Sequence, residues 1–496
     1  MAPPALPLPT RLAYGVGALA EGTKNGAFEF FLFFYYTQVL GLSGTLAGAA
    51  MMIAPLVDAV ADPLVGSLSD STRSRLGRRH PYLYAAALPM AAGFALLFAP
   101  PPGLGQLGLF AWLTGFALLV RFAMTLYFVP HMALGAELSD DYGERTSIVA
   151  VRAFFGLLGG IGAPILGLAI WFRSTPDHPA GQLDAAGYPG FGGVLAIGMA
   201  AAIWASALGT HHRIPLLVRP AAAPEPFGAG RLVREVRAAL ASPSFRALFS
   251  GVVVFFVMRG VQTSLGLHMG TYFWRITSAE LLELTIGSAA GVVVGLPVWT
   301  FAARRLDKKP TFLIGAAGFS AWVLLPPCLQ IAGAWPAHGS PAYLPSLVAA
   351  SALAAFFAAA ALVTAGSMMA DVADEHELAT GRRQEGLLFG AQSLAAKSAS
   401  GIGHQIAGLG LDAIAFPAGA AMDAVGPPQV LGLGLLAGPG VGLLAVVAIA
   451  LLAGYRLDRT RHAAIAHALD ERRGAAPLAS AGAPEVSAAG SVRAPP

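Results

Sequence analysis

Residues 46–69 read LAGAAMMIAPLVDAVADPLVGSLS, and this stretch decides the fold. It is almost entirely apolar, and about 20 such residues in a helix are enough to cross a bilayer. Only two of its residues are charged, Asp58 and Asp62, and they stand four positions apart. The stretch therefore predicts a transmembrane helix that carries two carboxylates. A basic loop follows it, with the arginines Arg73, Arg75, Arg78 and Arg79.

The composition of the whole chain is typical of a membrane protein. Its 496 residues are 56% hydrophobic and 12% charged, and the mean hydropathy is +0.64. A soluble domain carries about 25% charged residues, so many apolar helix faces must meet lipid. The net charge is +4, and the basic residues lie in loop clusters, which argues against a nucleic-acid partner. The single cysteine, Cys328, lies in an apolar run, so disulfides do not hold the fold.

Apolar runs separated by polar breakers recur along the chain and divide into two sets of six. We predict an all-α membrane protein with twelve transmembrane helices in two six-helix bundles. The bundles are expected at 1–210 and 246–455, with a cytoplasmic linker at 211–245 and a partly disordered cytoplasmic tail at 456–496. A short amphipathic helix is expected at 231–240 within the linker. The predicted spans are 12–40, 46–69, 82–100, 107–137, 146–172, 191–210, 246–274, 280–302, 310–333, 344–371, 386–412 and 431–455.

The distribution of basic residues predicts the orientation of these spans. Arginine and lysine gather in the loops after even-numbered spans, in the linker and at the start of the tail. Arg173 and Arg275 are the exceptions on the other side. Because cytoplasmic loops carry the excess of basic residues, both termini are expected in the cytoplasm. The sequence thus predicts a multi-pass protein of the bacterial inner membrane.

The two sets of spans also resemble one another at their ends. The fourth span ends in ELSDDYGER (137–145) and the tenth in ADVADEHELATGRR (370–383), each acidic and then basic. Two repeated halves are typical of transporters that bind their substrate between the halves, near the membrane midplane. Charged residues at these ends are predicted to act as gating contacts between helices: Asp70, Arg73, Arg75, Arg78, Arg79, Glu137, Arg145, Asp371, Arg382 and Arg383.

Several ionisable residues fall inside the predicted spans, where each costs about 2.5–3.5 kcal/mol to insert. Asp58 and Asp62 stand one helical turn apart, so their carboxylates share a face and repel each other. A cation or a shared proton between them would relieve that repulsion; a salt bridge to a neighbouring helix would do so as well. The intramembrane ionisable residues are Glu21, Lys24, Glu29, Asp58, Asp62, Arg121, Arg152, Arg259 and Lys397.

Polar residues in other spans are candidates for binding substrate. Glu21, Asn25 and Glu29 share one helix face, which either lines the pathway or forms an internal pair with Lys24. Lys397 has no local partner and small neighbours, which favours a coupling role. Tyr127, His131 and Gln262 could donate hydrogen bonds to a hydroxylated ligand or instead connect neighbouring helices.

Specific motifs add a family resemblance. DAVADP (58–63), RSRLGRRHPY (73–82), FYYTQVLGLS (34–43) and VRAFF (151–155) resemble the glycoside–pentoside–hexuronide:cation symporters, the melibiose-carrier branch of the major facilitator superfamily. The resemblance implies import of a sugar, glycoside or uronide together with a proton or Na⁺, without any other cofactor or metal. It also implies that Asp58, Asp62 and Thr125 bind the coupling cation, with Lys397 beside them.

Three departures from the family pattern change what is expected. Ala61 stands where sodium-using carriers have an asparagine, which favours a proton, although both ions stay open. Gly22 and Phe128 stand where the family has two sugar-binding aspartates. Without those acids the charge of Arg152 is less compensated. Either an anionic substrate such as a uronide neutralises it, or Arg152 pairs with Glu21 or Glu29.

Two rival functions follow from other features. The phenylalanines of the first span (Phe28, Phe30, Phe31, Phe33 and Phe34) would suit an amphiphile such as a lysolipid. A membrane enzyme would need a catalytic cluster in a sizeable loop, and the longest loops contain no metal-ligand or nucleophile set. We therefore expect a transporter of a small, sugar-like molecule that contacts membrane lipid and needs no protein partner.

Overall fold

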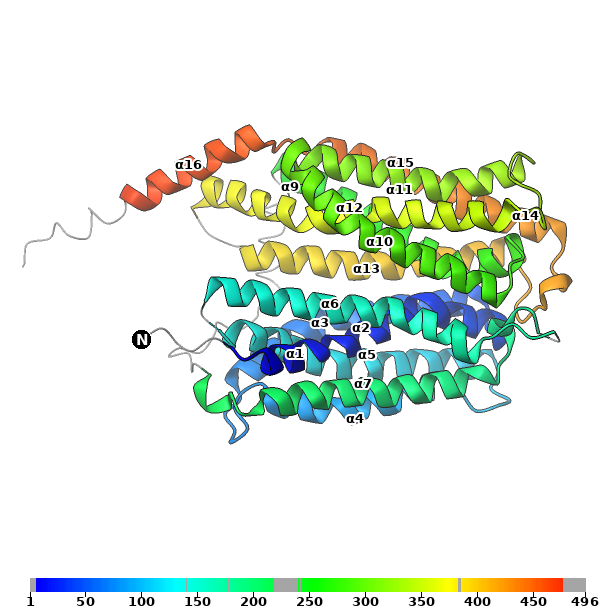
Figure 1. The fold of residues 1–496 in the computed structure, drawn as a ribbon, viewed down its shortest axis with the longest axis horizontal. Coiled ribbons are helices and arrows are strands. Elements are labelled where there is room, and N and C mark those ends of the chain that lie inside the picture. The colour runs from blue at the N-terminus through cyan, green and yellow to red at the C-terminus, as the bar shows by residue number, and fades with distance from the viewer. Residues whose placement is uncertain are drawn as a thin grey trace, which may run out of the picture.

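The computed structural model describes residues 6–139, 141–176, 178–217, 240, 242–381 and 385–475. Within these ranges every regular element is a helix. The long helices run side by side along the length of the molecule, in two groups that follow the order of the chain (Figure 1). The predicted all-α architecture is therefore confirmed.

The first group, which we call the N-terminal half, fills the first six predicted spans. Its first span is a succession of short helices, because α1 and α2 are followed by the two π-helical turns η1 and η2. The elements are α1 (Leu8–Val16), α2 (Ala18–Ala27), η1 (Phe28–Leu32), η2 (Tyr35–Val39), α3 (Gly44–Ser71), α4 (His80–Leu97), α5 (Gln106–Glu137), α6 (Tyr142–Leu166), η3 (Gly167–Trp171), η4 (Gly181–Leu183), α7 (Gly187–His211) and η5 (Ile214–Leu216).

The second group, the C-terminal half, fills the remaining predicted spans and adds one helix that the sequence analysis did not predict. That helix, α16, lies in the tail and packs against α12. The elements are α9 (Pro243–His268), η6 (Met269–Phe273), α10 (Ser278–Leu306), α11 (Lys308–Ile331), α12 (Tyr343–Thr380), α13 (Glu385–Ala413), η7 (Met422–Ala424), α14 (Pro427–Leu435), η8 (Leu436–Gly440), α15 (Val441–Ala453) and α16 (Arg459–Ala475).

The described helices confirm only part of the predicted set of twelve membrane-crossing helices. In the described part of the chain, nine helices are long and apolar enough to cross a membrane. The other three predicted spans correspond to the interrupted stretch 8–39, to α4 and to α13. Length and composition alone thus do not confirm the full count. The predicted domain boundaries also stay a prediction, because residues 218–239 and 241 lie outside the described residues, as does the tail beyond 475. The first of these stretches includes all but the last residue of the expected linker helix at 231–240.

Glycines let helices approach closely at two places that matter for the site. A Cβ at Gly22 on α2 would collide with the backbone carbonyl oxygen of Gly156 on α6. A Cβ at Gly408 on α13 would collide in the same way with the carbonyl oxygen of Gly44 on α3. Small residues at such contacts are how membrane helices pack closely. The second contact joins the two halves.

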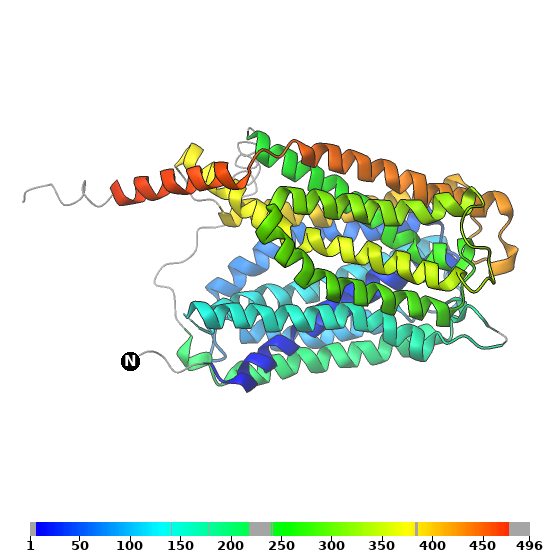
Figure 2. The ribbon, with the colours of Figure 1, turned by 45° about the horizontal axis from the view of Figure 1, so that its top comes forward.

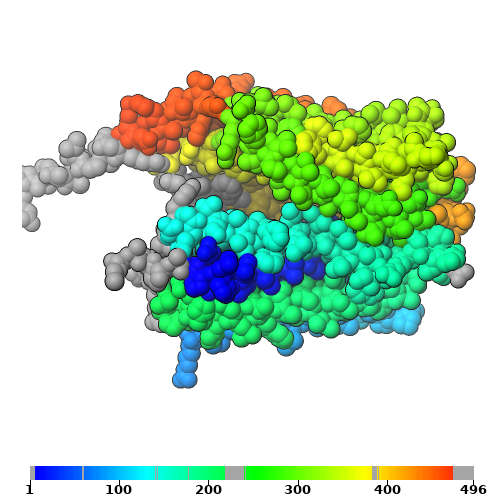
Figure 3. Space-filling view, in the orientation of Figure 1, coloured from blue at the N-terminus to red at the C-terminus, as the bar shows by residue number. Residues whose placement is uncertain are grey.

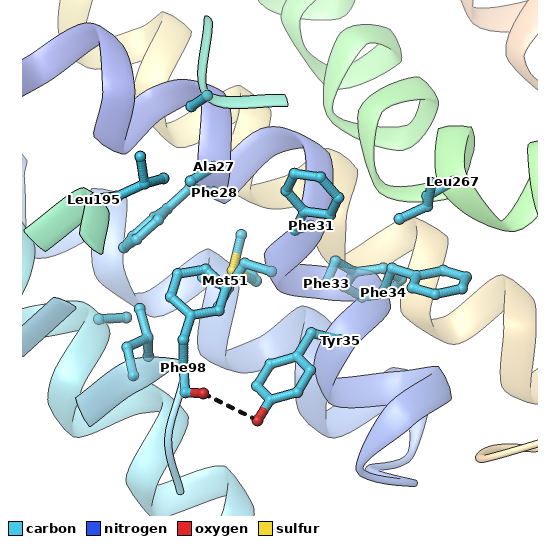
Figure 4. Packing of buried hydrophobic residues seen from close by; sticks show 14 of the residues in the cluster. Ala27, Phe28, Phe31, Phe33, Phe34, Tyr35, Met51, Phe98, Leu195 and Leu267 are labelled. Atoms are coloured by element: carbon cyan, nitrogen blue, oxygen red, sulfur yellow. Dashed lines mark hydrogen bonds between the residues drawn. The ribbon is translucent and has the colours of Figure 1, made fainter. Parts of the chain in front are cut away.

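Four of the five phenylalanines of the first span are buried in the core, where Phe33 and Phe34 also contact His268 of the C-terminal half. Phe28, Phe31, Phe33 and Phe34 are at most 3% exposed and pack among residues of neighbouring helices (Figure 4). The hydroxyl of Tyr35 donates a hydrogen bond to the carbonyl oxygen of Phe98 over 3.3 Å, which fixes the end of this span to α4 (Figure 4). This burial removes most of the aromatic stripe that suggested an amphiphilic substrate.

The two ends of the molecule differ. The described start of α1 and helix α16 lie at one end, which we call the terminal end (Figures 1 and 2). The surface is hollowed between α6 and the C-terminal half towards this end (Figure 3). Hydrogen bonds between the two halves gather at the opposite end. The structure is thus open at the terminal end and closed at the other.

The closure at the opposite end, which we call the far-end seal, consists of hydrogen bonds between named residues of the two halves. Asp412 on α13 accepts hydrogen bonds from the backbone N–H groups of Gly44 over 3.0 Å and Thr45 over 2.8 Å, at the start of α3. Other pairs in this seal are Thr37 with His268 at 3.1 Å, Tyr272 with Gln38 at 3.0 Å, and Gln182 with Thr271 at 2.9 Å. Ser278 also donates to Gln182, and the N–H of Ala279 donates to Ser174 over 3.1 Å.

The predicted gating residues at the terminal end connect helices within one half. Arg79 at the start of α4 forms an ion pair with Glu137 at the end of α5 over 2.8 Å, and also contacts Asp70. Lys308 and Asp371 form the equivalent pair of the C-terminal half over 2.6 Å. These two brackets repeat one another, as the sequence repeat suggested. Among the other predicted gating residues, Arg78 pairs with Glu137, and Arg145 donates a hydrogen bond to the carbonyl oxygen of Ser139. The side chains of Arg73 and Arg75 are exposed. Arg382 and Arg383 lie outside the described residues.

Candidate functional site

A cavity of about 310 Å³ lies between the two halves, near the middle of the long helices. Its volume falls at the lower end of the range for small-molecule sites. Most of the intramembrane ionisable residues that the sequence analysis singled out line it. The lining residues are Glu21, Lys24, Asn25, Glu29, Pro55, Asp58, Asp62, Arg121, Met124, Thr125, Phe128, Phe256, Arg259, Thr263, Ser393, Ala396, Lys397 and Ser400.

Asp62 on α3 connects the two halves at this cavity. One carboxylate oxygen, Oδ2, lies 2.5 Å from Lys397 Nζ on α13. The other, Oδ1, accepts a hydrogen bond from the Thr125 hydroxyl on α5 over 2.9 Å. The side chains of Asp62 and Lys397 are 32% and 37% exposed. A solute or ion that enters the cavity can therefore reach this pair.

Asp58, one turn earlier on α3, has a different partner. Its Oδ2 lies 2.6 Å from Arg121 Nη1 on α5, and the two side chains are only 7% and 18% exposed. Both residues belong to the N-terminal half. This pair therefore does not have to break when the two halves move relative to each other.

The sequence predicts a cation or proton between Asp58 and Asp62, with a structural salt bridge as the alternative. The structure gives each carboxylate its own basic partner, so their mutual repulsion is relieved without a bound ion. Only the Asp62 partner lies on the other half. A cation site at Asp58, Asp62 and Thr125 remains a prediction, and within it the accessible group is Asp62.

The polar face predicted for the first span lines the cavity. Glu21, Asn25 and Glu29 all contribute to the lining, as does Lys24. Lys24 is 7% exposed and lies close enough to Glu21 and Asp58 to interact with both electrostatically. The residues of this face therefore line the cavity, and an internal pair with Lys24 stays a prediction.

Four predicted substrate residues lie outside the lining of this cavity: Arg152, Tyr127, His131 and Gln262. Gln262 lines a neighbouring cavity and accepts a hydrogen bond from Arg259. Arg152 lies beside Tyr14 and Glu21, which agrees with the alternative that it is compensated within the protein. Tyr127 and His131 are fully buried in the N-terminal half. The His131 ring stacks on Tyr14 and on Tyr127, with ring centroids 4.3 and 5.0 Å apart. Their burial against α1 explains why they do not reach the cavity.

Gly22 and Phe128 show why the site differs from the family pattern. Gly22 packs against the backbone of α6, so this position has no room for the side chain of an aspartate. Phe128 lines the cavity and offers an aromatic ring where a carboxylate would stand.

Arg121 and Arg259 also line the cavity, although neither was among the predicted site residues. Their signal in the sequence was their charge inside an apolar span.

Two helical halves around a charged central cavity are typical of membrane transporters, in which the halves rock about a midplane site. A family model described as MFS/sugar transport protein matches residues 13–459. The chain belongs to this family, and it is a multi-pass membrane transporter and not an enzyme.

Curated relatives match most of the chain at low identity. An uncharacterized symporter of Synechocystis is 26% identical and covers 82% of this chain and 86% of its own. An isoprimeverose transporter of Lactiplantibacillus pentosus is 23% identical over 84% and 83%. A glucuronide carrier protein homolog of Escherichia coli is 25% identical over 80% and 82%. The mouse sodium-dependent lysophosphatidylcholine symporter 1 is 32% identical but covers only 34% of this chain and 32% of its own.

The fold agrees with solved transporter structures. A bacterial homolog of the human lysosomal transporter Spinster, in an inward-facing and unoccupied conformation, aligns with a TM-score of 0.62 at 13% identity. The alignment covers 90% of this chain and 96% of that one. The predicted major facilitator fold is therefore confirmed.

Proposed function

We propose that the protein is a cation-coupled symporter that imports a sugar, glycoside or uronide by alternating access. The observation that carries this proposal is the Asp62–Lys397 pair, because it joins the two halves at a cavity that solutes can enter. The names of the relatives that match most of the chain support a sugar-like cargo. The proposed site comprises Asp62, Asp58 and Thr125 for the cation, with Lys397 as the coupling residue.

The proposed orientation places the terminal end in the cytoplasm of a bacterial inner membrane. The arginine-rich loop at 73–79 and the basic start of α11 both lie at that end, where the positive-inside rule expects them. The far-end seal then faces outward and the hollow faces inward. In this orientation the structure is an inward-open carrier.

Charge compensation explains how a cation could drive the cycle. A proton or Na⁺ at Asp62 neutralises its carboxylate, so the attraction that holds Lys397 to α3 weakens. Lys397 then becomes available to the substrate, and α13 is free to change its position relative to α3. The cation and substrate therefore assist each other's binding by the same factor, as thermodynamic linkage requires.

Uptake into proteoliposomes tests the proposal. Labelled neutral glycosides, uronides and lysolipids are offered under an imposed proton or Na⁺ gradient, and the internal concentration is measured. We expect at least one glycoside or uronide to accumulate with one of the two ions, and no accumulation when the gradient is collapsed. If all glycosides and uronides only equilibrate under both gradients, the symporter proposal is wrong.

A lysolipid or similar amphiphile is the second candidate cargo. The partial match to the lysophosphatidylcholine symporter favours it. The burial of Phe28, Phe31, Phe33 and Phe34 in the core counts against it, and of the five rings only Phe30 lines a described cavity. The lysolipid arm of the uptake experiment decides between the two cargoes.

Weakening the far-end seal should shift the carrier towards an outward-open state. Asp412→Asn removes the charge that caps the start of α3 at Gly44 and Thr45. A lost cap costs about 1 kcal/mol, which changes the ratio of the two states about fivefold. The test uses a background in which Cys328→Ser removes the native cysteine and Met269→Cys introduces a cysteine to be labelled. An impermeant maleimide added from outside should label the Asp412→Asn variant of this background about fivefold faster than the background itself.

The matched control for this variant is Asp423→Asn, which changes a 95% exposed aspartate at the same end. Its labelling rate should equal that of the parent protein. If Asp412→Asn is also labelled at the parental rate, Asp412 does not contribute to the closure.

A further inference from the structure

A second cavity adjoins the central one and shares three lining residues with it. It measures about 420 Å³ and lies between the first span, α6, α9 and α10. Glu29, Arg259 and Thr263 line both cavities and therefore form their common border. The two cavities therefore adjoin at these three side chains and form two chemically different compartments.

The second compartment is mostly apolar. Beyond the border, its walls are formed chiefly by small and aliphatic residues such as Ile161, Leu267, Leu284 and Val292. By contrast, charged groups from α2, α3, α5 and α13 dominate the central cavity. A ligand that fills both must therefore have a polar end and an apolar end.

Arg259 lies at the border without an acidic partner. In the part of the chain that the structure describes, its contacts are a 2.9 Å hydrogen bond from Nη1 to Gln262 Oε1 and the Phe319 ring, 5.9 Å from the guanidinium carbon. These two contacts hold the side chain in place on α9. A guanidinium has five N–H donors, so most of its donors are left for a ligand.

The charges around the central cavity are balanced, and this balance favours an anionic cargo. Four acids and four basic groups line it, so its formal charge is zero. When a cation and a neutral sugar enter, the closed cavity gains one uncompensated positive charge, which is costly in a low-dielectric interior. When a cation and a monoanion enter together, the balance is kept. The acids are Glu21, Glu29, Asp58 and Asp62, and the bases are Lys24, Arg121, Arg259 and Lys397.

We infer that Arg259 is the specificity-determining residue of the transport site. It binds the anionic group of a glycoside, the carboxylate of a uronide, at the border of the two cavities, and the apolar cavity receives an apolar aglycone. The inference rests on the proposed function and names its substrate class. The sequence suggested Arg152 as the residue whose charge an anionic substrate neutralises. We assign this role to Arg259 instead, because Arg259 lines both cavities and Arg152 lines neither.

Ligand binding to the purified protein tests the assignment. Three probes are compared by isothermal titration: 4-nitrophenyl glucuronide, the neutral 4-nitrophenyl glucoside, and free glucuronate. The intact protein should bind the aryl glucuronide more tightly than either of the others. Arg259→Gln should weaken the glucuronide about 10- to 100-fold, because charge-assisted hydrogen bonds are lost. Its affinity for the neutral glucoside should stay unchanged.

Two further variants separate the roles of charge and of apolar contact. Glu29→Gln removes a like charge at the border, so the glucuronide should bind more tightly. Ala289→Phe fills the apolar cavity on α10, so the aryl glucuronide should lose its advantage over free glucuronate. Arg246→Gln, an exposed arginine on the same helix, is the matched control for Arg259→Gln and should change no affinity.

The outcomes distinguish this inference from the proposed function. If the intact protein binds the glucoside as tightly as the glucuronide, and Arg259→Gln alters neither, the inference is wrong while sugar symport stands. If Arg259→Gln weakens both aryl ligands equally, the residue has a structural role and the inference is also wrong. If none of the probes binds but lysophosphatidylcholine does, both the inference and the glycoside proposal fail.

Discussion

Replacing Asp62 by asparagine is expected to abolish accumulation of substrate against its gradient. The amide keeps the shape of the side chain but cannot hold a proton or attract Lys397, whose Nζ lies 2.5 Å from the carboxylate. The bond between α3 and α13 then no longer depends on the coupling ion. We expect the internal substrate concentration in proteoliposomes to stop at the external value, whichever ion gradient is imposed.

The same preparation supplies the controls for this variant. Asp423→Asn makes the same chemical change at an exposed site and should accumulate substrate normally. Equilibration without a gradient should persist in Asp62→Asn, which shows that the protein is folded and can still move. Gradient-driven accumulation at the parental level would remove Asp62 from the coupling mechanism.

Breaking the neighbouring pair should lower stability, in addition to its effect on the proposed cation site. Asp58 and Arg121 are 2.6 Å apart and mostly buried, and removing one partner of a buried ion pair leaves the other uncompensated. That loss costs about 3–5 kcal/mol. Both Asp58→Asn and Arg121→Gln should therefore lower the thermal unfolding midpoint of the detergent-solubilised protein more than Asp62→Asn does, since Asp62 is one-third exposed.

The double variant tests whether the two residues act as a pair. Asp58→Asn combined with Arg121→Gln leaves no charge without a partner, so it should be more stable than either single variant. A double-mutant cycle, which compares the two single variants with the double variant, isolates the interaction between the two side chains. Additive losses would show that Asp58 and Arg121 contribute independently, contrary to the contact in the structure.

The sequence predicted the elements of the fold well, because the length of an apolar run fixes where a membrane helix can lie. α3 was expected at 46–69 and is found at Gly44–Ser71; α13 was expected at 386–412 and is found at Glu385–Ala413. Helix α16 was missed because its sequence is polar. Its contacts with α12, among them His462 with Asp374 at 3.0 Å, come only from the folded structure.

The side-chain partners in the site were harder to predict than the spans. Helix α5 is mostly apolar and its few polar residues lie on more than one face, so its sequence alone does not show which face meets the cavity. The structure turns Arg121, Thr125 and Phe128 towards the cavity, and this spacing marks one helix face. Tyr127 and His131 lie on another face and are buried against α1. The partner of Asp58 depended on that rotation and was not predicted for the same reason.

The paired brackets at the terminal end have a consequence for inhibition. Arg79 with Glu137, and Lys308 with Asp371, each brace one half internally. A braced half moves as a single body, so every step of the cycle must take place along the seam between the bodies. An antibody fragment or cyclic peptide that wedges into the exposed part of this seam would stop turnover without competing with the cargo, and raising the cargo concentration would not relieve the block.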